Sequence, residues 1–186
     1  MERFLYSALF LVLVFNAPVV CQNKWQTADK ATKRLPPVDF PQLPKKIVKA
    51  LQERGCKIPQ AYHDPKPHNV LRGRFAKPNQ NDWAVLCSKN RVSSVLIFWG
   101  GSTTSVLEIL KSPDKNWLQG IGDEKIGFSR AIHPVNKKYI LEHYKSYGST
   151  KPPPIFYEGI DEGFVRKAST IHYFYRGKWL RLQGAD

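Results

Sequence analysis

Cysteine and methionine are scarce in this chain of 186 residues, which has 3 Cys and 1 Met. Three cysteines are too few for a disulfide-dense mini-protein or for a four-cysteine zinc site. Acidic residues are also in deficit, since 15 Asp and Glu stand against 29 Lys and Arg, a formal charge of +14. Apart from one apolar run near the start, no stretch approaches the roughly 20 residues of a membrane-spanning helix. The scarcity of cysteine excludes a disulfide-dense mini-protein and a four-cysteine zinc protein, and the lack of long apolar runs excludes a protein with several membrane spans. The excess of positive charge predicts attraction to polyanions.

Apolar residues nevertheless make up 42% of the chain and aromatic residues 12%. That content supports a packed core and excludes disorder throughout. The length suits one domain with a short appendage. Composition therefore bounds the fold but identifies neither a reaction nor a ligand.

The first 22 residues have the pattern of a secretory signal peptide. Arg3 precedes an uncharged apolar run at residues 4–15, and polar chain begins at Gln22. We expect cleavage near Cys21 or Gln22 and a secreted or periplasmic location. An uncleaved anchor and a lipoprotein are the alternatives, although the residues before Cys21 fit a lipobox poorly.

Export determines how the cysteines are interpreted. If Cys21 leaves with the signal peptide, Cys56 and Cys87 remain. Two cysteines in an oxidising compartment are expected to form a disulfide bond. A nucleophilic cysteine is the alternative, but no local motif would activate a thiolate at either position.

The exported chain divides into an arm and a body. Residues 23–43 are polar and rich in proline, which predicts an extended arm docked through Val38, Phe40 and Leu43. Residues 44–186 carry the periodic apolar pattern of a single domain.

Two short helices are predicted in the body. The first covers residues 44–56, with a proline in its first turn and Gly55 just past its end. The second runs from the capping residue Asn136 through residue 147, with Gly148 as its stop.

Strands account for most of the rest. Residues 69–75, 82–88 and 92–99 are strand candidates joined by short polar turns, which predicts an antiparallel meander. Further strands are expected at residues 105–110 and 126–132.

The C-terminus is predicted to form a hairpin of residues 170–175 and 178–182. A two-residue loop would place Tyr175 opposite Lys178. The predicted fold is α+β: a mainly antiparallel sheet, built from the meander and the C-terminal hairpin, with two short helices.

Four runs of sequence suggest a relationship. They are GCKIPQ at residues 55–60, GRF at 73–75, DWAVLCS at 82–88 and YFYRGKWLRL at 173–182. Together they resemble a group of uncharacterised secreted bacterial proteins over roughly residues 43–186. No activity is established for that group, so the resemblance implies export and supplies no catalytic residue.

The C-terminal hairpin also holds the one ligand site that the sequence favours. Aromatic and basic side chains alternate there and can grip sugar rings or anionic polymers by stacking and charge. The residues of this predicted site are Tyr173, Tyr175, Lys178, Trp179 and Arg181. The alternative is that the aromatics are half of a hydrophobic core and the cations are its solvated rim.

Signals for catalysis are weaker. His63, Asp64 and His68 offer metal-ligand atoms, but intervening prolines prevent a helical arrangement, and a surface loop is favoured. The adjacent acids Asp161 and Glu162 are expected in a turn. No nucleophile elbow or phosphate-binding loop is present in the sequence, so neither a metal nor a cofactor is expected.

We therefore expect an exported envelope or extracellular protein, a non-enzymatic binding or structural module. Its expected partner is an anionic envelope polymer or glycan rather than nucleic acid, and its oligomeric state is open. A secreted hydrolase is the alternative. A hydrolase would bring together, in one cleft, two or more of His63, His133, His143, His172, Asp82, Asp161 and Glu162.

Overall fold

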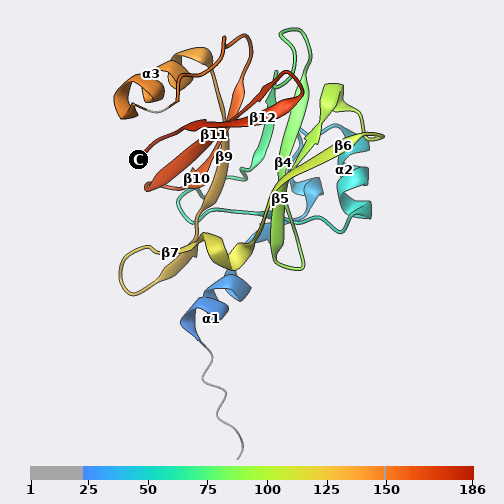
Figure 1. Ribbon diagram of the computed structural model, residues 1–186. Helices are drawn as coiled ribbons and strands as arrows, with labels where there is room; N and C mark the ends of the chain where they lie inside the picture. Colours follow the sequence, from blue (N-terminus) through green and yellow to red (C-terminus); the bar gives the residue numbers. More distant parts are fainter. Residues whose placement is uncertain (1–22, 149) are drawn as a thin grey trace, which may run out of the picture.

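The structure is a computed structural model that describes residues 23–148 and 150–186. The predicted signal peptide lies outside the described residues. The fold is α+β and mainly antiparallel, as predicted, with two four-stranded sheets stacked against each other (Figure 1). Helix α2 (Lys45–Glu53) covers the outer face of one sheet, and helix α3 (Lys137–Tyr147) covers the outer face of the other. Within the described residues, no helix has the length and apolar character needed to cross a membrane.

The first sheet is the predicted meander, with strand order β3-β4-β5-β6. Its strands are β3 (Val70–Gly73), β4 (Asp82–Lys89), β5 (Val92–Phe98) and β6 (Val106–Pro113). Strands β4 and β5 are apolar on both faces because both faces are covered. One face meets α2 and the other meets the second sheet.

The second sheet has the order β12-β11-β10-β9. Its strands are β9 (Arg130–Val135), β10 (Gly159–Phe164), β11 (Ala168–Tyr175) and β12 (Lys178–Gln183). Tyr175 pairs with Lys178, so the predicted hairpin register is confirmed. Arg176 and Gly177 both have positive φ, which a two-residue turn of type I′ requires at its two central positions.

The single strand predicted at residues 126–132 is divided between two strands in the structure. The range 126–132 contains β8 (Ile126–Phe128) and the start of β9, interrupted at Ser129. The Ser129 amide donates to the carbonyl of Trp117, and its carbonyl accepts from Val165. Strand β8 pairs with β7 (Leu118–Gly120) in a separate small sheet, so the break redirects the chain.

Strand β10 was not predicted, and placing Asp161 and Glu162 in a turn was wrong. Both acids lie inside β10, which pairs with β9 on one side and β11 on the other. Glycine and acidic residues have low strand propensity, but tertiary pairing overrides it here. Consecutive residues of a strand point to opposite faces, so Glu162 faces the first sheet and Asp161 faces away.

Both predicted helices are present. Helix α2 (Lys45–Glu53) starts after Pro44 and buries Ile47 and Leu51. Helix α3 (Lys137–Tyr147) is capped by the Asn136 side chain and ends at Gly148, whose left-handed φ of 61° suits glycine.

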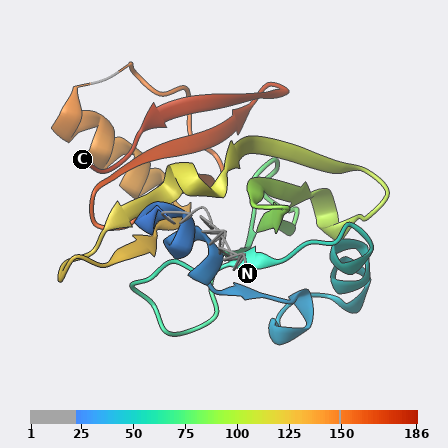
Figure 2. The same cartoon turned by 90° about the horizontal axis from the view of Figure 1, so that it is seen from below.

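The extended arm predicted for residues 23–43 is wrong in its first part, which forms helix α1 (Lys24–Ala31). Asn23 caps this helix, which packs beside the 3-10 helix η3 (Asp114–Trp117) and the β7–β8 hairpin (Figure 2). The remainder is irregular, apart from β1 (Arg34–Leu35), paired with β2 (Ile58–Pro59), and η1 (Pro37–Asp39). Phe40 and Leu43 are buried as expected, but Val38 is 57% exposed.

Arg34 fastens this segment to the body. Its Nη2 lies 2.8 Å from Asp29 Oδ1 and 2.7 Å from Asp114 Oδ2. Asp114 is completely buried at the start of η3 (Asp114–Trp117) and also accepts from the Ser88 hydroxyl at 2.6 Å. Residues 23–43 are therefore part of the folded body.

The predicted disulfide bond between Cys56 and Cys87 is present, with Cα atoms 5.4 Å apart. It joins the chain just after α2 to β4. Gly55, which has a φ of 70°, turns the chain at this point. The bond therefore ties the outer helix to the centre of the first sheet.

Candidate functional site

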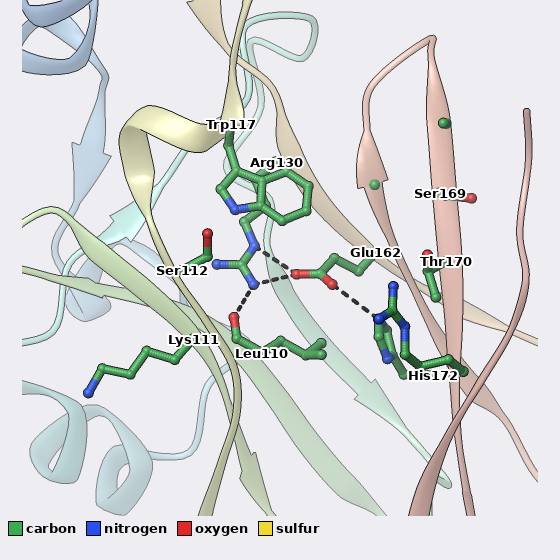
Figure 3. Close-up of a pocket in the computed structure, with 12 residues that line it drawn as sticks. Leu110, Lys111, Ser112, Trp117, Arg130, Glu162, Ser169, Thr170 and His172 are labelled. Carbon is green, nitrogen blue, oxygen red and sulfur yellow. Dashed lines mark hydrogen bonds and ion pairs between the residues drawn. The ribbon is translucent and has the colours of Figure 1, made fainter.

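A cleft of about 480 Å³ lies between the two sheets (Figure 3). We call it the inter-sheet cleft. Strand β6 and η3 form one side, and strands β9 to β12 form the other. Its lining residues are Leu110, Lys111, Ser112, Trp117, Arg130, Glu162, Gly163, Ala168, Ser169, Thr170, His172 and Arg181.

Arg130 lies at the bottom of the cleft and has no exposed surface. Its Nη1 donates to the carbonyl and the hydroxyl of Ser93, both at 2.8 Å. Its Nη2 donates to the carbonyl of Leu110 and to Glu162, and its Nε donates to the same Glu162 oxygen at 2.8 Å. All five N–H bonds of the guanidinium are used, so Arg130 connects β9 to both β5 and β6.

Glu162 joins Arg130 to His172. Its second carboxylate oxygen lies 3.0 Å from the Nε2 of His172 on the neighbouring strand (Figure 3). Burial acts to raise the pKa of Glu162, but the hydrogen bonds and charges of His172 and Arg130 outweigh it and lower that pKa. Glu162 is therefore ionised at neutral pH, with both oxygens occupied.

The cleft has an excess of positive charge. Lys111, Arg130 and Arg181 give 3 positive charges against 1 negative charge on Glu162, a formal balance of +2. Lys111 and Arg181 are exposed at the rim, whereas the Arg130 charge is matched by Glu162. Both rim cations can therefore attract an anion, and the Lys111 Nζ also lies 3.8 Å from the Glu108 Oε1 in an exposed ion pair.

Trp117 forms one wall. The guanidinium carbon of Arg130 lies 4.6 Å from its ring centroid, and Phe164 stacks on it at 4.8 Å. The indole Nε1 is buried without a hydrogen-bond partner among the described residues. A buried donor without a partner costs free energy, which a bound acceptor would recover.

The predicted hairpin site is split between the two faces of the second sheet. Tyr173 is completely buried against α3 and accepts a hydrogen bond from the amide of Phe156, so its ring is not available to a ligand. Tyr175 and Lys178 lie on that same face.

Trp179 and Arg181 lie on the opposite face, toward the first sheet. Arg181 lines the inter-sheet cleft. Trp179 is half-buried and stacks on Trp99 with ring centroids 6.0 Å apart, beside Phe174 at 5.5 Å. Of the five predicted residues, these two remain as a candidate pair for one ligand.

A second cavity, of about 320 Å³, lies on the outer face of β9, β10 and β11. We call it the histidine cavity, because His63 and His133 line it together with Asp161. His63 comes from the loop after β2, while His133 and Asp161 are directly paired across β9 and β10. Three residues that the sequence proposed for a hydrolase thus converge here.

Two atoms of the histidine cavity lack partners. The Nδ1 of His63 and the Oδ1 of Asp161 are buried without a hydrogen bond to any described residue. The pKa of His63 is lowered, mainly by burial and to a smaller extent by the charge of His68. Burial raises the pKa of Asp161, against the opposing influence of the nearby Ser169 side chain, of the charge of His133 and of the hydrogen bond from the Tyr139 hydroxyl to Oδ2. This environment suits proton transfer better than the paired Glu162 does.

Other candidates have structural partners. Asp82 is fully buried and accepts hydrogen bonds from the amides of Phe75 and Gly100 at 2.9 and 2.8 Å. His68 uses both ring nitrogens, on the Ala61 amide and the Lys66 carbonyl. Among the described residues, no group of three or more His, Cys, Asp or Glu is placed to hold a metal ion.

Sequence reasoning missed Arg130, Lys111 and Trp117. Arg130 lies in the strand predicted at residues 126–132, and Lys111 and Trp117 lie outside the predicted helices and strands. None of the three belongs to a motif, and their meeting depends on how the two sheets stack. The pairing of Glu162 with His172 depends on β10, which was not predicted.

Comparison with protein-family models, with curated proteins and with solved structures finds no match to this chain.

Proposed function

We propose that this chain is an exported binding protein that holds an anionic glycan in the inter-sheet cleft. The observation that carries the proposal is the charge of the cleft, +2 overall, with the cations Lys111 and Arg181 at its rim. Carboxylate groups pair well with arginine and lysine at such a site. Trp179 lies two residues from Arg181 on the same face of β12, where a half-buried indole can stack on a sugar ring.

The cleft is better suited to binding than to catalysis. Every N–H of Arg130 is already used. Both oxygens of Glu162 are occupied, and its lowered pKa makes it a poor proton donor near neutral pH. The buried trio holds the sheets in place, and the rim cations do the recognition.

Export rests on the predicted signal peptide and on the disulfide bond between Cys56 and Cys87. A closed loop of 31 residues suits a domain that matures in an oxidising compartment. A secreted or periplasmic location follows as part of the proposal, and so does an envelope glycan as partner.

The test is calorimetric titration of the folded protein with tetragalacturonate, a short uronic-acid glycan. Removing one rim charge, by Arg181→Gln or Lys111→Gln, should weaken binding roughly tenfold. Lys178→Gln is the matched control, because it removes the same charge from the same strand as Arg181 but on the other face. Equal losses in the control would show unspecific attraction, and no binding by the parent protein would refute the proposal.

A second candidate function is acid–base hydrolysis in the histidine cavity. The observation in its favour is that His63, His133 and Asp161 line one cavity. Two imidazoles can serve as general acid and general base on one substrate. Turnover of bis(p-nitrophenyl) phosphate that is lost in His133→Ala would support this function, and no turnover by the parent protein would oppose it.

A further inference from the structure

We propose that the histidine cavity cleaves RNA, with His63 taking a proton from the ribose 2′-hydroxyl and His133 giving one to the leaving oxygen. This inference rests on the second candidate function and names its substrate class. It stands apart from the glycan proposal, which concerns the other face of the sheet.

The geometry brings two imidazoles to one cavity from separate parts of the fold. His133 is on β9, directly across from Asp161 on β10, with both side chains on the outer face of the sheet. His63 reaches the cavity from the loop after β2, and the charges of the two imidazoles act on each other. The cavity, at about 320 Å³, falls in the size range of small-molecule sites.

The roles follow from the surroundings of each ring. Burial lowers the pKa of His63, so its imidazole is neutral at neutral pH and can accept a proton. His133 is exposed at the cavity edge beside the Asp161 carboxyl. The unpartnered Oδ1 of Asp161 is a further hydrogen-bond acceptor for a hydroxyl of the substrate.

Positive charge, both in the cavity and over the whole protein, favours a substrate that carries phosphate groups. Arg166 and Lys167 line the cavity and can contact phosphate oxygens, although Asp161 and Asp186 balance them formally. The net charge of +14 attracts any polyanion to the surface. Local recognition would come from Arg166, Lys167 and the imidazoles, and long-range attraction from the net charge of the whole chain.

The reaction needs no co-reactant in its first step. His63 removes the 2′-hydroxyl proton, and the 2′-oxygen forms a bond to phosphorus. The bond from phosphorus to the 5′-oxygen breaks, and His133 protonates that oxygen. The products are a 2′,3′-cyclic phosphate and a free 5′-hydroxyl. In a second step water opens the cyclic phosphate with the two roles exchanged.

The experiment uses a DNA oligonucleotide that contains one ribonucleotide, with mass spectrometry of the products. We expect cleavage at that single position, a 2′,3′-cyclic phosphate end, and no cleavage of the all-DNA strand. EDTA should leave the rate unchanged, because the steps are proton transfers. His63→Ala and His133→Ala should each lower the rate about 100-fold or more.

The matched control is His143→Gln. It removes an imidazole that stacks on Tyr139 on α3 and does not line the cavity, so cleavage should persist. Near-UV circular dichroism checks that each variant is folded. Cleavage that survives in both alanine variants would show a contaminating nuclease and refute the proposal. Turnover of bis(p-nitrophenyl) phosphate without RNA cleavage would refute RNA as the substrate but leave the acid–base site standing. No turnover of either substrate would refute both the RNA proposal and the acid–base hydrolysis on which it rests.

Discussion

Replacing Arg130 with methionine should destabilise the protein severely. Methionine keeps most of the side-chain volume but removes all five N–H donors. Glu162 would then be left as a buried carboxylate with only His172 beside it, and the Ser93 and Leu110 carbonyls would lose a donor. Breaking one side of a buried ion pair costs about 3–5 kcal/mol. That loss is a large part of the 5–15 kcal/mol, roughly, that stabilises a typical domain.

Urea denaturation measures the change. With a slope of about 2 kcal/mol per molar, a loss of about 4 kcal/mol lowers the midpoint by roughly 2 M. Arg72→Met is the control, because Arg72 is an exposed arginine on β3 and its loss should change stability by less than about 0.5 kcal/mol. A midpoint for Arg130→Met within experimental error of the parent protein would refute the reasoning.

A double variant and a pH series sharpen the test. Arg130→Met with Glu162→Leu removes both charges and should recover much of the lost stability. The pKa of Glu162 is lowered in the folded state, so its contribution is present above its ordinary value of 4.5 and is lost as the pH falls below that value. Arg130→Met removes part of the cause, so stability should fall less steeply below pH 4.5 than in the parent protein.

Three further outcomes are expected. Replacing Cys56 and Cys87 together with serine should lower the free energy of unfolding, measured in urea, by about 3–4 kcal/mol, because the loop between them spans 31 residues. A mass that shows two free thiols in the exported parent protein would contradict the bond. Trp179→Ala should lower the melting temperature through a loss of about 1–3 kcal/mol, because its half-buried ring stacks on Trp99. An unchanged melting temperature would contradict this packing role, whatever the effect on glycan binding. Arg34→Met should lower the free energy of unfolding by about 3–5 kcal/mol, because it leaves the buried Asp114 carboxylate without its charged partner. Limited proteolysis should then cut the chain near α1 faster than in the parent protein.

The parts of the fold that the sequence predicted depend on local rules. Gly148 ends α3, the two-residue loop determines the hairpin register, and a double-faced apolar pattern identifies β4 and β5 as central strands. Each of these follows from a few neighbouring residues. The disulfide bond followed from the number of cysteines and the expected compartment rather than from any contact.

The parts that were missed depend on distant contacts. Strand β10 has two glycines and two acids, and it is held by neighbours on both sides rather than by its own propensity. Helix α1 looks polar because its one buried side chain, Asp29, is an acid paired with Arg34. The cleft and the histidine cavity also require β10, so no local pattern could have located them.

The inter-sheet cleft and the histidine cavity share a wall. Gly163, Ala168 and Ser169, where β10 meets β11, line both. The two strands approach closely there, since a Cβ on Gly163 would lie 2.4 Å from the Ala168 carbonyl oxygen. A ligand that displaces this wall from one side must reshape the space on the other. Thermodynamic reciprocity then requires each ligand to change the affinity for the other by the same factor.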